Sequence, residues 1–76
     1  MSLERFKELS LKIGKKIATE EEKNEYMTYL FQNGKLTEKQ YEDYNSGKRR
    51  SDLLDFALFA GALLFLGWML KKVTEN

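Results

Sequence analysis

Residues Asp55–Lys72, DFALFAGALLFLGWMLKK, decide the fold of this 76-residue chain. The segment from Phe56 to Leu70 carries no charge, and two lysines follow it. A helix on the surface of a soluble protein has charged positions on one side, whereas this segment is apolar on every side. Such a helix is buried in a large core or in lipid, and a chain of this size has little core to offer. The sequence therefore predicts a transmembrane helix over residues 53–70.

The length and the ends of this segment fit a membrane span. Residues 53–70 would extend about 27 Å as a helix, close to a hydrocarbon thickness of ~30 Å. Asp52 is the expected N-cap. Asp55 falls in the first turn, where a carboxylate can accept hydrogen bonds from unpaired backbone N–H groups. Basic and tryptophan side chains anchor helix ends at headgroup depth. The predicted membrane-interface anchors are Lys48, Arg49, Arg50, Trp68, Lys71 and Lys72.

The distribution of basic residues predicts the orientation of the span. Five basic residues lie in the segment before it, and two follow it: Lys35, Lys39, Lys48, Arg49 and Arg50, then Lys71 and Lys72. The side with more basic residues stays in the cytoplasm. We therefore expect a cytoplasmic N-terminus and a tail-anchored architecture, in which residues 71–76 form a short tail.

Small residues recur along the predicted span. Ala57 and Gly61 are four residues apart, and Ala60 and Gly67 fall on nearly the same side of the helix. Small residues let helices approach closely in lipid, although glycine and alanine are also common in membrane helices generally. The predicted helix–helix interface comprises Ala57, Ala60, Gly61, Leu64 and Gly67. The remaining large residues, Phe56, Phe59, Leu63, Leu66 and Leu70, would then face lipid or another subunit.

Apolar residues at helical spacing predict a basic amphipathic helix over residues 1–18, with Ser2 as its N-cap. The stripe comprises Leu3, Phe6, Leu9, Ile13 and Ile17. It is larger than a short hairpin can cover, so we interpret it as a partner-binding stripe. Two alternatives are that the stripe lies on the membrane surface or packs on the neighbouring hairpin.

Residues 19–47 read as a helical hairpin. Thr19 with Glu22, and Thr37 with Gln40, have the spacing of capping boxes. Asn33 and Gly34 form a typical helix stop between them. Residues 48–52 would then be a basic linker next to the membrane.

The second half of this hairpin resembles the SHOCT family of short helical domains. The shared signature consists of Gly34, Leu36, Thr37 and Tyr41 and lies within about twenty residues. In that family the hairpin usually follows the hydrophobic segment, whereas here it precedes it. The resemblance implies an oligomerising or protein-binding module.

The composition argues against several classes of protein. The absence of cysteine and histidine excludes disulfides and the usual zinc ligands, and leaves no nucleophile–base pair. We therefore expect no enzyme, cofactor, metal or small-molecule substrate. A net charge of +1 and one short basic run, Lys48–Arg50, do not predict binding to nucleic acid.

These observations predict an all-α protein with a short N-terminal amphipathic helix, a helical hairpin and a C-terminal transmembrane helix. Its expected partners are membrane lipid and a larger membrane protein complex, of which it would be an accessory or structural subunit. A virion or phage membrane protein belongs to the same class. One alternative is a self-oligomerising protein of the holin or toxin kind. Another is a soluble helical oligomer.

Overall fold

The computed structural model describes residues 2–74, and the side chains of residues 2–71. Its four helices are α1 (Leu3–Gly14), α2 (Glu20–Gln32), α3 (Glu38–Asn45) and α4 (Arg50–Thr74). The described part of the chain contains no strand, which confirms the all-α prediction. Helix α4 is also long and apolar enough to cross a membrane, over Arg50–Lys71.

Side-chain caps start the first three helices at the predicted residues. The hydroxyl of Ser2 accepts a hydrogen bond from the backbone N–H of Arg5 at 3.1 Å. Both predicted capping boxes are formed, by Thr19 with Glu22 and by Thr37 with Gln40. Each box satisfies two backbone N–H groups that a helix start leaves unpaired. Local sequence therefore determines where these helices begin.

Three helix boundaries differ from the prediction, and one of them is the end of α4, which continues to Thr74 into the predicted tail. Helix α1 ends at Gly14, because the chain turns at Lys16, whose φ angle is 62°. Helix α4 begins at Arg50, since the carbonyl of Arg49 already accepts a hydrogen bond from Leu53 at 2.9 Å. Asp52 therefore lies in the first turn of α4 and is not its N-cap. The predicted basic linker is thus partly helical.

The α2–α3 hairpin is closed by aromatic and aliphatic packing. The rings of Phe31 and Tyr41 stack with centroids 4.4 Å apart. The hydroxyl groups of Thr28 and Tyr41 lie 2.8 Å apart and share a hydrogen bond. Leu36, in the turn between the helices, is buried. These contacts confirm the predicted hairpin.

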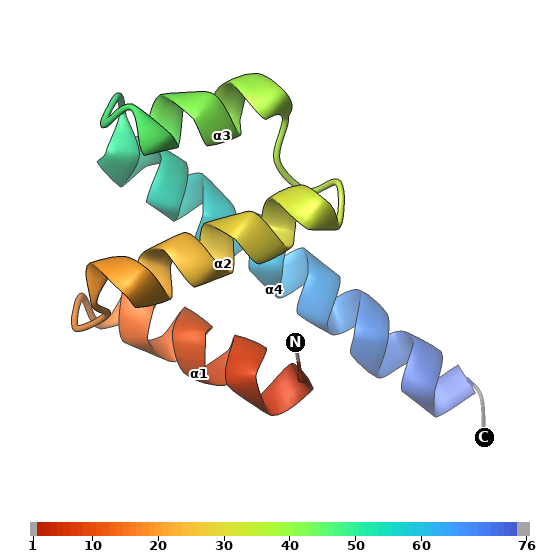
Figure 1. Cartoon of the computed structure of the whole chain (residues 1–76). Helices are drawn as coiled ribbons and strands as arrows, with labels where there is room; N and C mark the ends of the chain where they lie inside the picture. Colours follow the sequence, from red (N-terminus) through yellow and green to blue (C-terminus); the bar gives the residue numbers. More distant parts are fainter. Residues whose placement is uncertain (1, 75–76) are drawn as a thin grey trace.

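All four helices contribute to one hydrophobic core. Its buried members are Phe6, Leu9 and Ile13 of α1, Tyr26, Met27 and Leu30 of α2, Leu36 and Tyr44 of the α3 region, and Leu53 and Ala57 of α4. The first half of α4 is therefore part of the core, as Figure 1 shows where α4 passes behind α2. The sequence-based expectation that the rest of the chain could not shelter this helix is thus wrong for its inner side.

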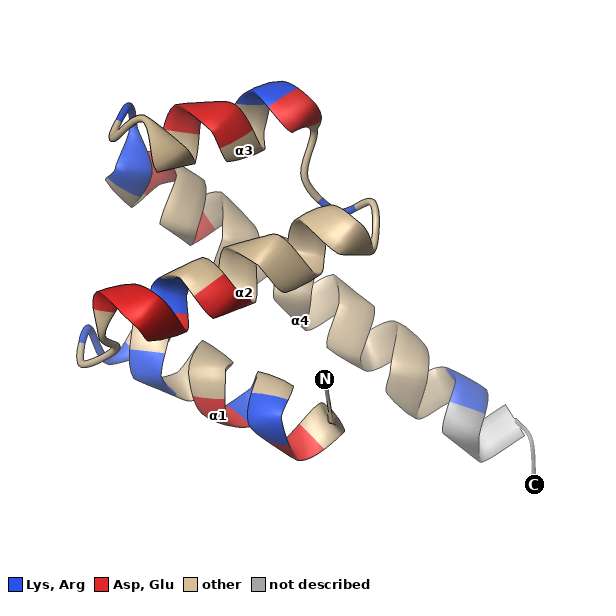
Figure 2. Ribbon diagram, in the orientation of Figure 1, with Lys and Arg blue, Asp and Glu red and all other residues tan. Residues whose placement is uncertain are grey.

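Burial of α4 is incomplete and one-sided. Only 22% of the most apolar segment of α4, within Arg50–Lys71, is buried against the rest of the chain. In Figure 1 the C-terminal half of α4 extends beyond the other helices. Figure 2 shows the charged residues gathered on α1, α3 and the first half of α2, with none on α4 between Asp55 and Lys71. The fold therefore combines a polar head with an apolar projecting helix.

Candidate membrane and partner interface

The outer face of α4 is a continuous apolar surface. It consists of five side chains at alternating spacings of three and four residues, each 42–66% exposed: Phe56, Phe59, Leu63, Leu66 and Leu70. These are the residues predicted to face away from the helix–helix interface. Soluble monomers rarely expose a large contiguous apolar patch. The outer face therefore has the character of a surface that lipid or another protein covers.

The inner face of α4 carries the predicted helix–helix interface, and it packs within the chain itself. Ala57 and Ala60 are buried, and Leu64 is half-buried beside the core. A Cβ atom added to Gly61 would collide with the Tyr26 hydroxyl and approach Phe6 Cζ to 3.0 Å. A Cβ atom at Gly67 would meet nothing within 4 Å. In this conformation the inner face is occupied up to Leu64, and a second copy has no access to it.

Tyr26 is the central residue of this contact. Its ring stacks on that of Phe6 with centroids 4.9 Å apart. Its hydroxyl accepts a hydrogen bond from Ser10 at 3.0 Å and donates one to the carbonyl of Ala57 at 3.4 Å. Burial raises the pKa of the phenol, so the hydroxyl remains a donor at neutral pH. One side chain of α2 thereby connects α1 with α4.

Trp68 extends this contact along α4. Its ring lies 5.7 Å from that of Phe6 and 6.0 Å from that of Tyr29, in edge-to-face geometry. Such pairs stabilise packing beyond the area that they bury. Side-chain contacts of α1 and α2 with α4 therefore reach as far as Trp68. The membrane-interface role predicted for Trp68 would require a different environment from this one.

The predicted basic anchors have different surroundings. Lys48 and Arg49 are exposed. Arg50 donates hydrogen bonds to Glu20 at 2.6 Å and to the Tyr44 hydroxyl at 3.0 Å. The bond from Arg50 lowers the pKa of the Glu20 carboxyl. Arg50 thus fastens the start of α4 to α2 and α3. At the other end, Lys71 lies on α4, whereas the Lys72 side chain falls outside the described residues.

The predicted partner-binding stripe on α1 is mostly covered. Phe6, Leu9 and Ile13 are 0–6% exposed and belong to the core. The two ends of the stripe, Leu3 and Ile17, are 38% and 64% exposed. The reason is that α2 and the inner face of α4 pack on the middle of the stripe. Only its ends are accessible to a partner in this conformation.

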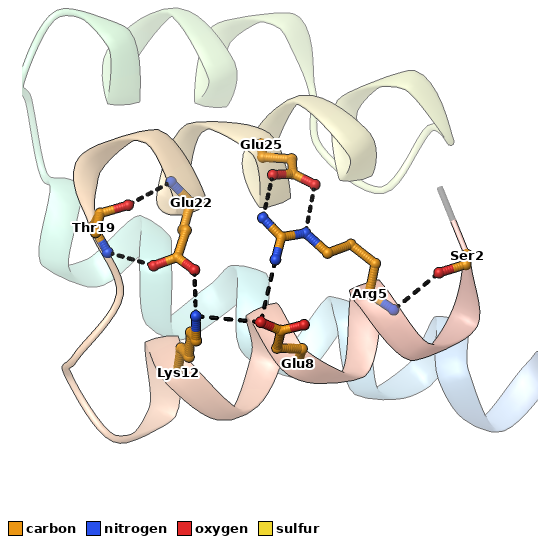
Figure 3. A network of polar contacts seen from close by, with 7 residues as sticks. All are labelled: Ser2, Arg5, Glu8, Lys12, Thr19, Glu22 and Glu25. Carbon is orange, nitrogen blue, oxygen red and sulfur yellow. Dashed lines mark hydrogen bonds and ion pairs between the residues drawn. The ribbon is translucent and has the colours of Figure 1, made fainter.

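A polar network that sequence reasoning missed holds α1 against α2. Arg5 donates two hydrogen bonds to the carboxylate of Glu25, at 3.0 and 2.9 Å, and Lys12 lies 2.7 Å from that of Glu22 (Figure 3). Glu8 of α1 accepts from both cations, at 3.3 and 3.2 Å. Lys12, together with the Thr19 N–H, lowers the pKa of Glu22 to about 2. The sequence does carry one indication of this network: helices that are consecutive in the chain have side chains of opposite charge, Arg5 and Lys12 on α1 and Glu22 and Glu25 on α2.

An apolar groove separates α1 from α4 on the surface. Its volume is about 350 Å³, and Lys7, Leu11, Ala62 and Leu66 are among its lining residues. Leu11 is 53% exposed, so the groove continues the outer face of α4 onto α1. Within the described residues, no group of three acidic side chains could hold a metal ion. The chemistry of this surface is that of an apolar contact.

Comparisons of the chain with protein-family models, curated proteins and solved structures give no match. No family model supports the resemblance of the hairpin to SHOCT domains.

Proposed function

We propose that this protein is a single-pass membrane protein that acts by binding other proteins. In this proposal α4 is the span, and α1, α2 and α3 form a head on the cytoplasmic side. The protein would serve as an accessory or structural subunit of a larger membrane assembly. The observation that carries the proposal is the exposed outer face of α4, which the rest of the chain leaves uncovered.

The dimensions and energetics of α4 support a lipid environment. The candidate span Arg50–Lys71 has 22 residues, and its charged side chains lie in its first two turns and at its last residue. It would extend about 33 Å, against a hydrocarbon thickness of ~30 Å. Full burial of one large apolar side chain contributes roughly 1.5–3 kcal/mol. At each of the five positions of the outer face, about half of this burial free energy is not gained within the chain, since these side chains are 42–66% exposed. Lipid would supply the remainder.

The orientation rests on the basic residues before α4. Lys48 and Arg49 are exposed directly before the helix, and more basic residues precede the span than follow it. By the positive-inside rule, the head then stays in the cytoplasm. The head offers exposed apolar side chains to a partner at Leu3, Leu11 and Ile17.

Quenching of Trp68 fluorescence tests the insertion of α4. Trp68 is the only tryptophan, so its emission reports on α4 alone. In vesicles containing brominated lipids, the emission should be quenched, and the protein should resist extraction with carbonate. An emission that brominated lipids do not affect, with full release by carbonate, would contradict the proposal.

Cysteine labelling tests the orientation, because the chain has no cysteine of its own. Ser46→Cys places a thiol at an exposed position between α3 and α4. In intact cells this thiol should be protected from a membrane-impermeant maleimide and should react after lysis. Ser2→Cys gives a second position in the head as a control. Labelling of both thiols in intact cells would show that the head lies outside the cytoplasm and would contradict the proposed orientation.

A soluble helical oligomer is the second candidate. The alternating spacing of three and four along the outer face is the pattern by which two helices pair. However, the neighbouring positions Ala62, Phe65 and Met69 are apolar, whereas the flanks of a soluble helix pair are usually charged. Lipid therefore suits this face better. A defined oligomer in detergent-free buffer, with no binding to vesicles, would favour the second candidate.

The self-oligomerising alternative relied on the small residues of α4. Ala57, Ala60 and Gly61 pack within the chain, so in this conformation they support no contact between copies. That alternative requires α4 to leave the head first.

A further inference from the structure

The closed fold and a membrane span make competing demands on the same residues. A span needs about 20 residues, and the part of α4 beyond Trp68 is far shorter than that. The remainder, from Leu53 to Trp68, carries the contacts with α1 and α2. The helix therefore cannot cross a bilayer while its inner face stays packed on the head.

The head cannot follow α4 into hydrocarbon. Helices α1 and α2 carry ion-paired side chains alongside the contact, including Arg5 with Glu25 and Lys12 with Glu22. Ionised groups are costly at the centre of a bilayer. The charged helices must therefore remain in water, and α4 must separate from them to insert.

We propose that α4 has two alternative positions, one packed against α1 and α2 and the other across a bilayer. This inference rests on the proposed function. In the first position α4 acts as an intramolecular ligand, with Ala57, Ala60 and Gly61 against the head. In the second position lipid replaces the head as the environment of the inner face. When α4 moves from the first position to the second, its inner face passes from one apolar environment to another. Its outer face, which is exposed in the first position, becomes covered by lipid.

The connection between α3 and α4 suits such a movement. The turn contains Gly47 and Arg49, with φ angles of 80° and 51°. Arg50 fastens α4 through an exposed ion pair with Glu20 and a part-buried hydrogen bond to the Tyr44 hydroxyl. Exposed ion pairs contribute little to stability, so the pair with Glu20 is readily released. The turn remains as the link between the head and the inserted helix.

Release of α4 has a consequence for binding. The middle of the α1 stripe, Phe6, Leu9 and Ile13, is in the core of the closed chain. Departure of α4 removes one of the helices that cover it. The predicted partner-binding stripe then becomes accessible after insertion, so insertion and partner binding are coupled in this order.

A reversible cross-link between α1 and α4 tests the proposal. Lys7 and Ala62 are exposed and line the same groove from opposite helices. The variant Lys7→Cys/Ala62→Cys is joined by a bis-maleimide that contains a reducible disulfide. The locked protein should lose insertion into vesicles, measured by quenching of Trp68 with brominated lipids, and reduction of the linker should restore it. The two single-cysteine variants, treated with the same reagent, should insert normally.

A pair of glycine variants tests the same proposal in the opposite direction. Gly61→Ala weakens the closed position through the clash with Tyr26, and should increase the rate of insertion by about fivefold or more. Gly67→Ala, which has open space, should leave the rate unchanged.

The outcomes separate the two proposals. Equal insertion of the locked and the reduced protein would overturn the release of α4 while leaving the membrane span intact. Failure of the uncrosslinked protein to insert would overturn the span itself and the release with it.

Discussion

The hydroxyl group of Tyr26 occupies the space that a side chain at Gly61 would need. A Cβ atom on Gly61 would approach Tyr26 Cζ to 2.9 Å, in addition to its collision with the hydroxyl. This contact brings α2 against the backbone of α4, and it explains why a glycine lies at this point of the helix.

Gly61→Ala should destabilise the closed chain by about 1–3 kcal/mol, because the core must shift to admit a methyl group. Chemical denaturation followed by circular dichroism in buffer with mild detergent measures this change. Gly67→Ala is the matched control, since its added methyl group meets nothing within 4 Å. There the higher helix propensity of alanine should leave stability unchanged or raise it by up to about 1 kcal/mol. Equal stability of the two variants would contradict the packing of α4 on Tyr26.

Tyr26→Phe should destabilise the chain by about 0.5–1.5 kcal/mol, because Ser10 and the carbonyl of Ala57 lose a hydrogen-bond partner. The ring itself remains, so its stacking on Phe6 is retained. Tyr29→Phe is the control, as the Tyr29 side chain contributes to this region through ring contacts. Denaturation curves of the two variants provide the comparison. A larger loss in Tyr29→Phe than in Tyr26→Phe would be inconsistent with the described network.

The network between α1 and α2 should make stability depend on pH in the acidic range. The pKa of Glu22 is about 2 in the folded chain against an ordinary value of 4.5, so the folded state binds its proton less readily. Its contribution is complete above pH 4.5 and disappears as the pH falls toward about 2. The variant Lys12→Met should reduce this dependence, while Lys15→Met, an exposed position outside the described ion pairs, should not. Acid titration of the denaturation midpoint measures the difference.

Leu63→Lys should abolish membrane insertion without changing the fold of the head. Leu63 is 54% exposed on the outer face, so a lysine is tolerated there in water. Near the centre of a span, however, a lysine costs roughly 2.5–3.5 kcal/mol. Leu3→Lys, at an exposed apolar position of α1, serves as the control and should insert normally. Carbonate extraction of membranes from expressing cells measures the result, and retention of Leu63→Lys in the membrane would contradict a position of Leu63 near the centre of a span.

The helix starts of the head were predictable because capping depends on residues close in sequence. Thr19 with Glu22 and Thr37 with Gln40 act within four residues, as does Ser2. Gly34 likewise ends its helix through its own φ angle of 71°. Such features require no knowledge of tertiary structure.

The position of α4 was not predictable in the same way. An amphipathic helix has a polar side that indicates which direction faces the core, whereas Phe56–Leu70 lacks a charge on any side. The small residues Ala57, Ala60 and Gly61 did mark a close contact, but the sequence does not state whether the partner belongs to the same chain. The pairing of Arg5 with Glu25 was hidden for a related reason, since 20 residues separate the two.

The place of α4 after the other helices in the chain has a consequence for synthesis. The ribosome produces Tyr26 35 residues before Gly61, an interval of about 2–7 s at about 5–20 residues per second. During that time the nascent head has no helix to complete it. A chaperone that binds the newly made protein would thus contact the uncovered apolar side chains of α1 and α2 before α4 has been synthesised.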